Sequence, residues 1–218
     1  MHARHLSESR LYVPPISPHK LIQELVFYDP WMLTVICIML NKTSPKQVKN
    51  VIFQFFKHWP NPQVAAETTI QEVSEVIRPL GLFRKRAEYI IALSKKFLTD
   101  DWKQLTEFKG VGTYGNDAYK IFCCGEWKTM IPSDHKLNDY HNWIATLHKS
   151  EKKPETFKRI NIENDEVWCA IESEDMNKMD KEELKWWKGL VKKRRNLRHS
   201  KGLILKMMRS GVLLRVRI

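Results

Sequence analysis

Hydrophobic positions recur at helical spacing along most of the first 150 residues. In the segment before Pro60 they follow the i, i+3, i+4, i+7, i+8 pattern of a helix with one buried face. These positions are Val48, Val51, Ile52, Phe55 and Phe56. No alternating pattern typical of a strand competes with such segments before residue 150. The pattern therefore predicts an all-α fold.

Start and stop signals locate further helices. Asp29 offers an N-cap and Pro30 the first helical position of an apolar segment, 31–40, which we expect to be a fully buried helix. Pro79 and Gly81 stop a shorter helix that covers 73–77. Two more helices are expected, a short one at 21–25 and an amphipathic one at 87–98.

Size and composition limit the number of domains. A chain of 218 residues, 43% of them hydrophobic, can bury one substantial core. We expect the main domain at 18–149, after an arm at 1–17 that is part of a stretch with three prolines ending at Pro18. A basic C-terminal extension at 150–218 follows, with a KKRR run at 192–195 that favours phosphate attraction and nuclear import. The sequence leaves open whether this extension is ordered.

The formal net charge of +12 favours a polyanionic partner. Nucleic acid is the first candidate, and an anionic membrane surface is the second. No apolar run approaches the roughly 20 residues that span a bilayer. The N-terminal string MHARHLSESR also lacks the apolar core of a signal peptide. We therefore expect a soluble, intracellular protein.

Cysteine spacing argues against a zinc site or an iron–sulfur cluster. The four cysteines lack the paired short spacings of a zinc site and the four-ligand run of a ferredoxin cluster. We expect reduced, mostly buried thiols, no metal and no cofactor. The four positions are Cys37, Cys123, Cys124 and Cys169.

Two features carry candidate chemistry. The tripeptide Gly110-Val111-Gly112 separates two short helical patterns, and its glycines would let backbone amides approach a phosphate. Alone, it also fits an ordinary turn between helices. About twenty residues downstream, Asp134 precedes a helix whose inward face we expect to be Leu137, Ile144 and Leu147. Alone, Asp134 is better explained as a helix cap.

In combination, these features resemble a known family. The strings SPHKLIQE, DPWMLTVICIMLNKTS, PLGLFRKRA, FKGVGTYGNDAYKIFC and DHKLNDYHNW are similar to the mismatch glycosylase domain of methyl-CpG-binding domain protein four, in the helix-hairpin-helix DNA glycosylase superfamily. The resemblance covers 14–147, roughly three-fifths of the chain, and stops near Lys149. It implies an all-α, two-lobed helix-hairpin-helix fold with the active site in the cleft between the lobes.

The resemblance implies roles at the reacting centre. Asp134 matches the family's catalytic aspartate, which stabilises positive charge on the deoxyribose and activates water. Tyr114 matches a tyrosine at the place where bifunctional relatives carry a lysine nucleophile. A monofunctional glycosylase, without efficient strand cleavage, is therefore implied. Lys109, on the hairpin, is expected to contact phosphate.

Extrusion of the base is assigned in the same way. Leu82 matches the family's wedge, an apolar side chain that inserts between base pairs. Lys42 stands where the vertebrate version has arginine, so forked recognition is in doubt there. Gln23 matches a glutamine of the base pocket. Taken without the family, these residues could instead be a core leucine, a solvated lysine and a surface glutamine.

Backbone contacts complete the assignment. Lys136 and the amides of Gly110, Val111 and Gly112 would hold the DNA backbone around the flipped nucleotide, adding affinity without base identity. The implied substrate is double-stranded DNA with thymine or uracil opposite guanine, handled by a nuclear, monomeric enzyme of base excision repair. Two alternatives stay open at this point: a helix-hairpin-helix DNA-binding module without catalysis, and a glycosylase for another damaged base.

Overall fold

The computed structural model describes residues 12–99, 102, 104–149 and 179–209. Throughout these ranges the regular structure is helical and no strand occurs, which confirms the predicted all-α fold. The α-helices are α1 (Gln23–Val26), α2 (Pro30–Leu40), α3 (Pro45–His58), α4 (Pro62–Glu67), α5 (Ile70–Ile77), α6 (Phe83–Phe97), α7 (Thr113–Tyr119), α8 (His135–Lys149) and α11 (Lys181–Arg209). Short turns of tighter or wider helix lie at Arg78–Leu80, Leu105–Glu107, Lys120–Cys124 and Trp127–Thr129.

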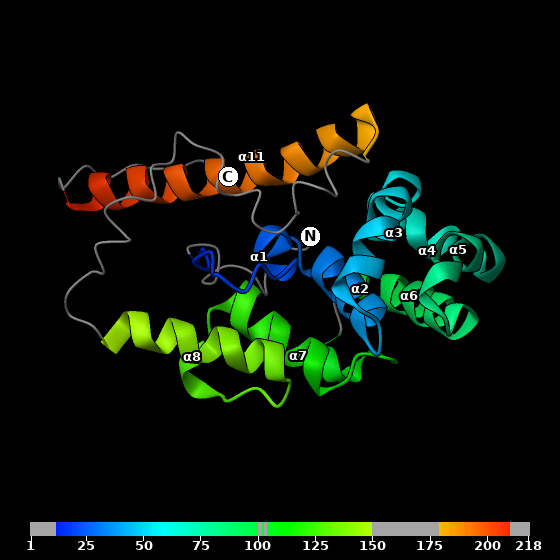
Figure 1. Cartoon of the computed structure of the whole chain (residues 1–218), viewed down its shortest axis with the longest axis horizontal. Coiled ribbons are helices and arrows are strands. Elements are labelled where there is room, and N and C mark those ends of the chain that lie inside the picture. Colours follow the sequence, from blue (N-terminus) through cyan, green and yellow to red (C-terminus); the bar gives the residue numbers. More distant parts are fainter. Residues whose placement is uncertain (1–11, 100–101, 103, 150–178, 210–218) are drawn as a thin grey trace.

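Helix α2 stands at the centre of two groups of helices (Figure 1). Helices α3, α4, α5 and α6 lie on one side of it, and α1, α7, α8 and α11 lie on the other. Helix α2 contacts α1, α3, α6 and α7, and every residue from Pro30 to Met39 is buried. The expected buried helix is therefore confirmed. It forms the shared core of a two-lobed fold.

Side-chain caps fix where the helices begin. The carboxylate of Asp29 accepts a hydrogen bond of 2.9 Å from the amide of Met32, and Pro30 follows at the first helical position, as predicted. Helix α3 begins with a capping box formed by Ser44 and Gln47. These local signals explain why most helices could be located from the pattern. Helix α4 was missed because it has six residues, of which only Ala65 is buried.

The buried face of α8 differs in one position from the prediction. Leu137 and Ile144 are buried as expected, but Leu147 is only partly buried. Tyr140 is fully buried instead, and its hydroxyl donates a hydrogen bond of 3.0 Å to the carbonyl of Pro15. An apolar pattern does not include Tyr140, because its hydroxyl makes it polar, although the ring carries most of its surface.

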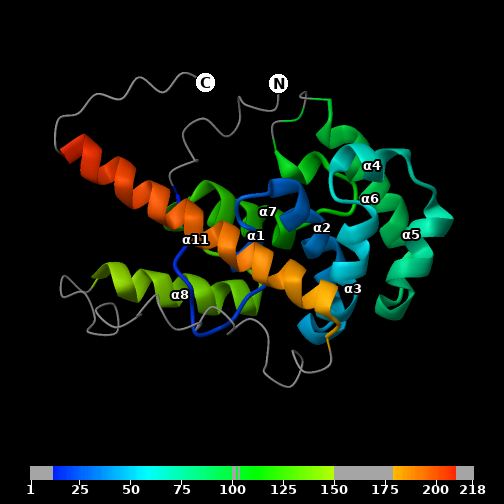
Figure 2. The same cartoon turned by 90° about the horizontal axis from the view of Figure 1, so that it is seen from above.

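The C-terminal helix α11 belongs to the core. Trp187 is fully buried, and Leu190 and Val191 are each 6% exposed. Seen from above, α11 crosses α1 and reaches α3 (Figure 2). There the Trp186 ring stacks on Phe56 with centroids 6.1 Å apart. The compact unit therefore continues past residue 149 into a segment whose order the sequence left open.

The described residues also bear on the cysteines, on membrane-spanning helices and on metal sites. Cys37 and Cys123 are buried, Cys124 is partly buried, and all three are free thiols, as expected. Cys169 and the first part of the extension lie outside the described residues. Within the described ranges, no helix is long and apolar enough to cross a membrane. In the same ranges, no group of three or more His, Cys, Asp or Glu side chains could hold a metal ion.

Candidate active site

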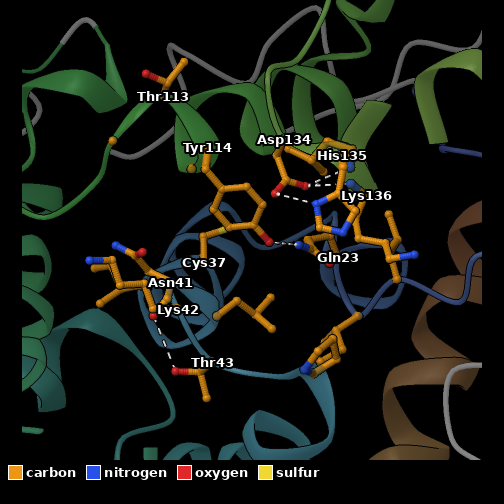
Figure 3. A pocket seen from close by; sticks show the side chains of 18 of the residues that line it. Gln23, Cys37, Asn41, Lys42, Thr43, Thr113, Tyr114, Asp134, His135 and Lys136 are labelled. Carbon is orange, nitrogen blue, oxygen red and sulfur yellow. Dashed lines mark hydrogen bonds and ion pairs between the residues drawn. The ribbon is translucent and has the colours of Figure 1, made fainter. Parts of the chain in front are cut away.

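A cavity of about 690 Å³ opens where α1, α2, the hairpin, α7 and the start of α8 meet the loop between α2 and α3 (Figure 3). One carboxylate, that of Asp134, lines it. Four lysines also line it: Lys20, Lys42, Lys49 and Lys136. The cavity is therefore suited to an anionic ligand, with a single acid at its wall.

Asp134 caps helix α8 and lines the cavity at once. Its Oδ1 accepts hydrogen bonds of 3.0 Å from the amides of both Lys136 and Leu137. Because both amides bind Oδ1, Oδ2 remains available to the cavity, 4.0 Å from Nδ1 of His135. The side chain is 29% exposed. Asp134 can therefore cap α8 and act in the cavity at the same time, because the cap fixes the direction of its carboxylate.

Gln23 and Tyr114 form a pair beside Asp134 (Figure 3). The side-chain amide of Gln23 donates a hydrogen bond of 2.7 Å to the Tyr114 hydroxyl. Gln23 is 3% exposed, which excludes the surface glutamine that the sequence alone allowed. Burial, together with the nearby Cys37 and Asp134, raises the pKa of Tyr114. The phenol is therefore neutral at physiological pH.

Cys37 is a cavity residue that the sequence did not identify. It comes from α2 and lies behind Tyr114 in the cavity wall. Burial raises the pKa of the Cys37 thiol to about 12, so it is a neutral thiol against the Gln23–Tyr114 pair. Nothing in the apolar run of α2 distinguishes the helix face that meets the cavity, because every side of this helix is buried.

The hairpin joins the short turn at Leu105–Glu107 to α7. Gly110 has a φ of 85°, in the left-handed region that favours glycine, and Gly112 precedes the first residue of α7. Val111 is 6% exposed, and this burial anchors the turn in the core. All three residues line the cavity, as the phosphate-clamp prediction requires. Lys109 does not line it.

A side chain has no room at Gly110 but has room at Gly112, so substitutions at the two hairpin glycines can be compared directly. A Cβ on Gly110 would lie 2.2 Å from Cδ2 of Tyr89, whereas a Cβ on Gly112 would meet nothing within 4 Å. We expect Gly110→Ala to lower the free energy of unfolding by about 1–3 kcal/mol, from backbone strain before any clash is counted. Gly112→Ala should change it much less. Urea denaturation of both variants checks this, and equal stabilities would contradict it.

Leu82 and Lys42 lie on two adjacent loops. Leu82 is 63% exposed, which excludes the core leucine that the sequence alone allowed. It does not line the cavity, whereas Lys42 does. Both have left-handed backbones, with φ of 48° at Leu82 and 57° at Lys42. Strained non-glycine residues persist where the surrounding structure holds them.

Arg86 holds the two loops together. It is 4% exposed, and its guanidinium donates to the carbonyl of Gly81 at 2.7 Å and to Oγ1 of Thr43 at 2.6 Å. It also donates to the carbonyls of Leu80 and Asn41. These hydrogen bonds join the Leu82 loop to the Lys42 loop as one unit. The sequence did not identify Arg86, which occurs among several basic residues at the start of α6.

A known protein family matches most of the chain. The model of the HhH-GPD superfamily of base excision DNA repair proteins matches residues 35–188. The chain belongs to this superfamily. The match confirms the family proposed from the sequence, and it reaches from the middle of α2 into α11. Among the site residues, Gln23 precedes it.

Three relatives show how this superfamily member compares with curated proteins. It is 42% identical over 138 residues to a methyl-CpG-binding domain protein 4-like protein of Arabidopsis thaliana, covering 63% of this chain and 31% of the relative. It is 30% identical over 135 residues to a thymine-DNA glycosylase of Aeropyrum pernix, covering 59% and 60%. It is 21% identical over 153 residues to an endonuclease III of Thermotoga maritima, covering 66% and 70%. The chain thus spans about a third of the length of the first relative and about three-fifths of the second.

Proposed function

We propose that this chain is a monofunctional DNA glycosylase that hydrolyses the N-glycosidic bond of thymine or uracil opposite guanine. The observation that carries the proposal is the Asp134 carboxylate, held by two amides and lining the same cavity as the Gln23–Tyr114 pair. Two relatives bear the names thymine-DNA glycosylase and thymine/uracil-DNA glycosylase. The superfamily's place in base excision repair supports the same reaction class.

The chemistry follows from the position of the carboxylate. A base inside the duplex stack must first be flipped out, and the cavity volume of about 690 Å³ lies in the range of small-molecule sites. As the C1′–N bond breaks, positive charge develops on the deoxyribose, and Asp134 stabilises it. Water then forms the new C1′–O bond and gives up a proton to the carboxylate. The base leaves with the bonding electron pair and an abasic site remains.

Gln23 is our candidate for reading the base. One N–H of its amide is engaged by the Tyr114 hydroxyl, which fixes the orientation of the amide. Its carbonyl oxygen is then available to accept from the N3–H of thymine or uracil. Both bases present this donor, whereas N3 of cytosine is an acceptor. The pair therefore favours the two deaminated pyrimidines over the undamaged one.

Tyr114 also supports the monofunctional assignment. Schiff-base lyases use a lysine amine as nucleophile. A neutral, partly buried phenol that accepts a hydrogen bond from Gln23 offers no amine at this position. Strand breakage should therefore depend on added alkali.

Leu82 is our candidate wedge, and its removal gives a directional prediction. We expect Leu82→Ala to slow single-turnover excision from duplex DNA by roughly tenfold or more, because the gap left by the flipped base is no longer filled and unstacking costs a few kcal/mol. The same variant should be nearly normal on a single-stranded substrate. Val64→Ala is the matched control, since Val64 is also exposed, at 42%. An equal loss on both substrates would argue against a wedge.

A second function class is a DNA-binding module without catalysis. The hairpin glycines and the four lysines of the cavity favour DNA binding on their own. In such a module Asp134 would only cap α8, and the Oδ2 atom that it leaves to the cavity would have no chemical role. A glycosylase for another damaged base would keep the carboxylate and differ in its preference.

A panel of duplexes separates these functions. Single-turnover excision would be measured on G·T and G·U mispairs, on undamaged G·C and A·T pairs, and on duplexes with oxidised guanine or mispaired adenine. The proposal predicts release from G·T and G·U alone. Release only from another base would move the function to that base. Binding without release of any base would favour the module.

The basic run at 192–195 further leads us to propose nuclear import, which a fluorescent fusion would test.

A further inference from the structure

Left-handed backbone at non-glycine residues marks one further position at the cavity. Among the described residues there are three such positions, Lys20 (φ 56°), Lys42 (φ 57°) and Leu82 (φ 48°). Lys42 and Leu82 already have proposed roles at the DNA. Lys20 has none, yet it lines the same cavity and its side chain is exposed. Backbone strain of this kind costs on the order of 1–3 kcal/mol, clusters at ligand-binding sites and persists only where the surrounding structure holds it.

A buried carboxylate holds the turn that carries Lys20. Glu24 is 2% exposed, and its Oε2 accepts a hydrogen bond of 2.7 Å from the amide of Ser17. Its Oε1 accepts from the Ser17 hydroxyl at 2.6 Å and from the amide of Leu21 at 3.1 Å. The amide of Lys20 closes the turn onto the carbonyl of Ser17 at 3.4 Å. Both ends of the Ser17–Leu21 turn are thus bound to one side chain.

Helix α11 braces this turn from outside. Arg194 is 4% exposed, and its guanidinium donates to the carbonyl of Glu24 and to the carbonyl of Pro14. It therefore joins α1 to the segment that precedes the turn. Arginine suits this task because its planar fork binds two acceptors at once. The turn is fixed from within by Glu24 and from without by Arg194, while the Lys20 side chain projects from it.

The charge around Lys20 indicates its ligand. In the part of the chain that the structure describes, no carboxylate lies within ion-pair distance of its ammonium group. Asp134 supplies the one carboxylate among the lining residues, against four lysines, and its ion-pair contact is with His135 and not with Lys20. An exposed lysine whose backbone turn is held at the wall of a cavity for a flipped nucleotide is suited to a backbone phosphate, which it binds as a point charge.

We propose that Lys20 is a further DNA-backbone contact of this site, with its ammonium on a phosphate beside the flipped nucleotide, and that Glu24 and Arg194 are positioning residues for it. This inference rests on the proposed function, because it needs DNA at the cavity. It adds a contact from the segment before α1 to those expected from the hairpin and Lys136.

The salt dependence of binding tests the contact. The full chain would be titrated with a G·T duplex whose target sugar carries a 2′-fluorine, which disfavours the oxocarbenium-like transition state and keeps the substrate intact. Lys20→Gly removes the charge and tolerates the left-handed backbone. We expect it to reduce the slope of log K against log salt by about 0.9, so that a fourfold rise in salt weakens the variant about 3.5-fold less than the unaltered chain.

Three further variants provide two controls and a test of the positioning role of Glu24. Lys20→Arg keeps the charge and should keep the slope. Lys95→Gln is the control, because Lys95 is exposed near the far end of α6, about 20 Å along the helix axis from Leu82. In Glu24→Gln one carboxylate oxygen becomes an NH₂ group. This group cannot accept the hydrogen bond that the amide of Ser17 or Leu21 donates to Glu24. It should lower the slope like Lys20→Gly, with no further loss when the two are combined.

The outcomes separate this inference from the proposed function. A wild-type slope for Lys20→Gly, or failure of Lys20→Arg to keep it, overturns the contact. A wild-type slope for Glu24→Gln overturns the positioning role. Excision of thymine from the ordinary G·T duplex by the unaltered chain is measured alongside. If excision is found while the Lys20 variants bind with the wild-type slope, the function stands and the contact falls. If the unaltered chain does not bind the duplex, both fall.

Discussion

Replacement of Asp134 by asparagine is expected to slow single-turnover excision of thymine from a G·T duplex by on the order of 10²- to 10⁴-fold. The variant removes the charge that stabilises the deoxyribose in the transition state and the base that takes the proton from water. Asparagine remains a good N-cap, so the hydrogen bonds to Lys136 and Leu137 should survive. The unfolding free energy is then nearly unchanged, and the loss is chemical.

Asp180→Asn is the matched control for this variant. Asp180 caps α11 through a hydrogen bond of 2.8 Å from the amide of Glu183, and it does not line the cavity. The same change of charge at an equivalent cap should leave excision intact. Asp134→Ala adds a test of the cap, because loss of an N-cap costs about 1 kcal/mol. If Asp134→Asn kept full activity while Asp134→Ala lost stability, Asp134 would be a cap and nothing more.

Trp187→Ala should have the largest effect on stability, a loss of about 3–5 kcal/mol in the free energy of unfolding. The ring is fully buried, and its neighbours on the same helix, Leu190 and Val191, are also in the core. A loss of this size is a large part of the total stability of an ordinary domain. It should also reduce the soluble yield. Urea denaturation measures it directly.

Gly189→Ala is the counterpart two residues away on α11. Gly189 is exposed, and a Cβ there would meet nothing within 4 Å. Because alanine favours a helix over glycine by about 1 kcal/mol, this variant should be as stable as the natural chain or slightly more so. Little effect from Trp187→Ala, below about 1 kcal/mol, would mean that α11 is a dispensable extension.

The fold could be predicted well where local signals act. The caps at Asp29 and Ser44, and the apolar stripe of α3, are properties of a few neighbouring residues, and they give the helices and most of their ends. Burial of α2 also follows from its composition. The packing of α11 could not be predicted in this way, because its charged residues outnumber the few apolar ones that reach the core.

The residues of the candidate site could also be predicted only in part from the sequence. Asp134, Tyr114 and Gln23 were proposed from the sequence through resemblance to a family, and the cavity brings the three together. Arg86 and Glu24 were not found, because their importance lies in the backbone groups they bind, which no spacing reveals. A buried arginine or glutamate looks like any surface charge until the fold supplies its partners.

The most direct test of the central claim is the product formed by the unaltered chain from a G·T duplex in a single turnover. Free thymine and the DNA strand would be assayed separately, before and after alkali. The proposed reaction predicts one free thymine per abasic site, with an intact strand that breaks only in alkali. Thymine release with strand breakage before alkali would contradict the monofunctional assignment. DNA binding with no thymine released would contradict the glycosylase itself.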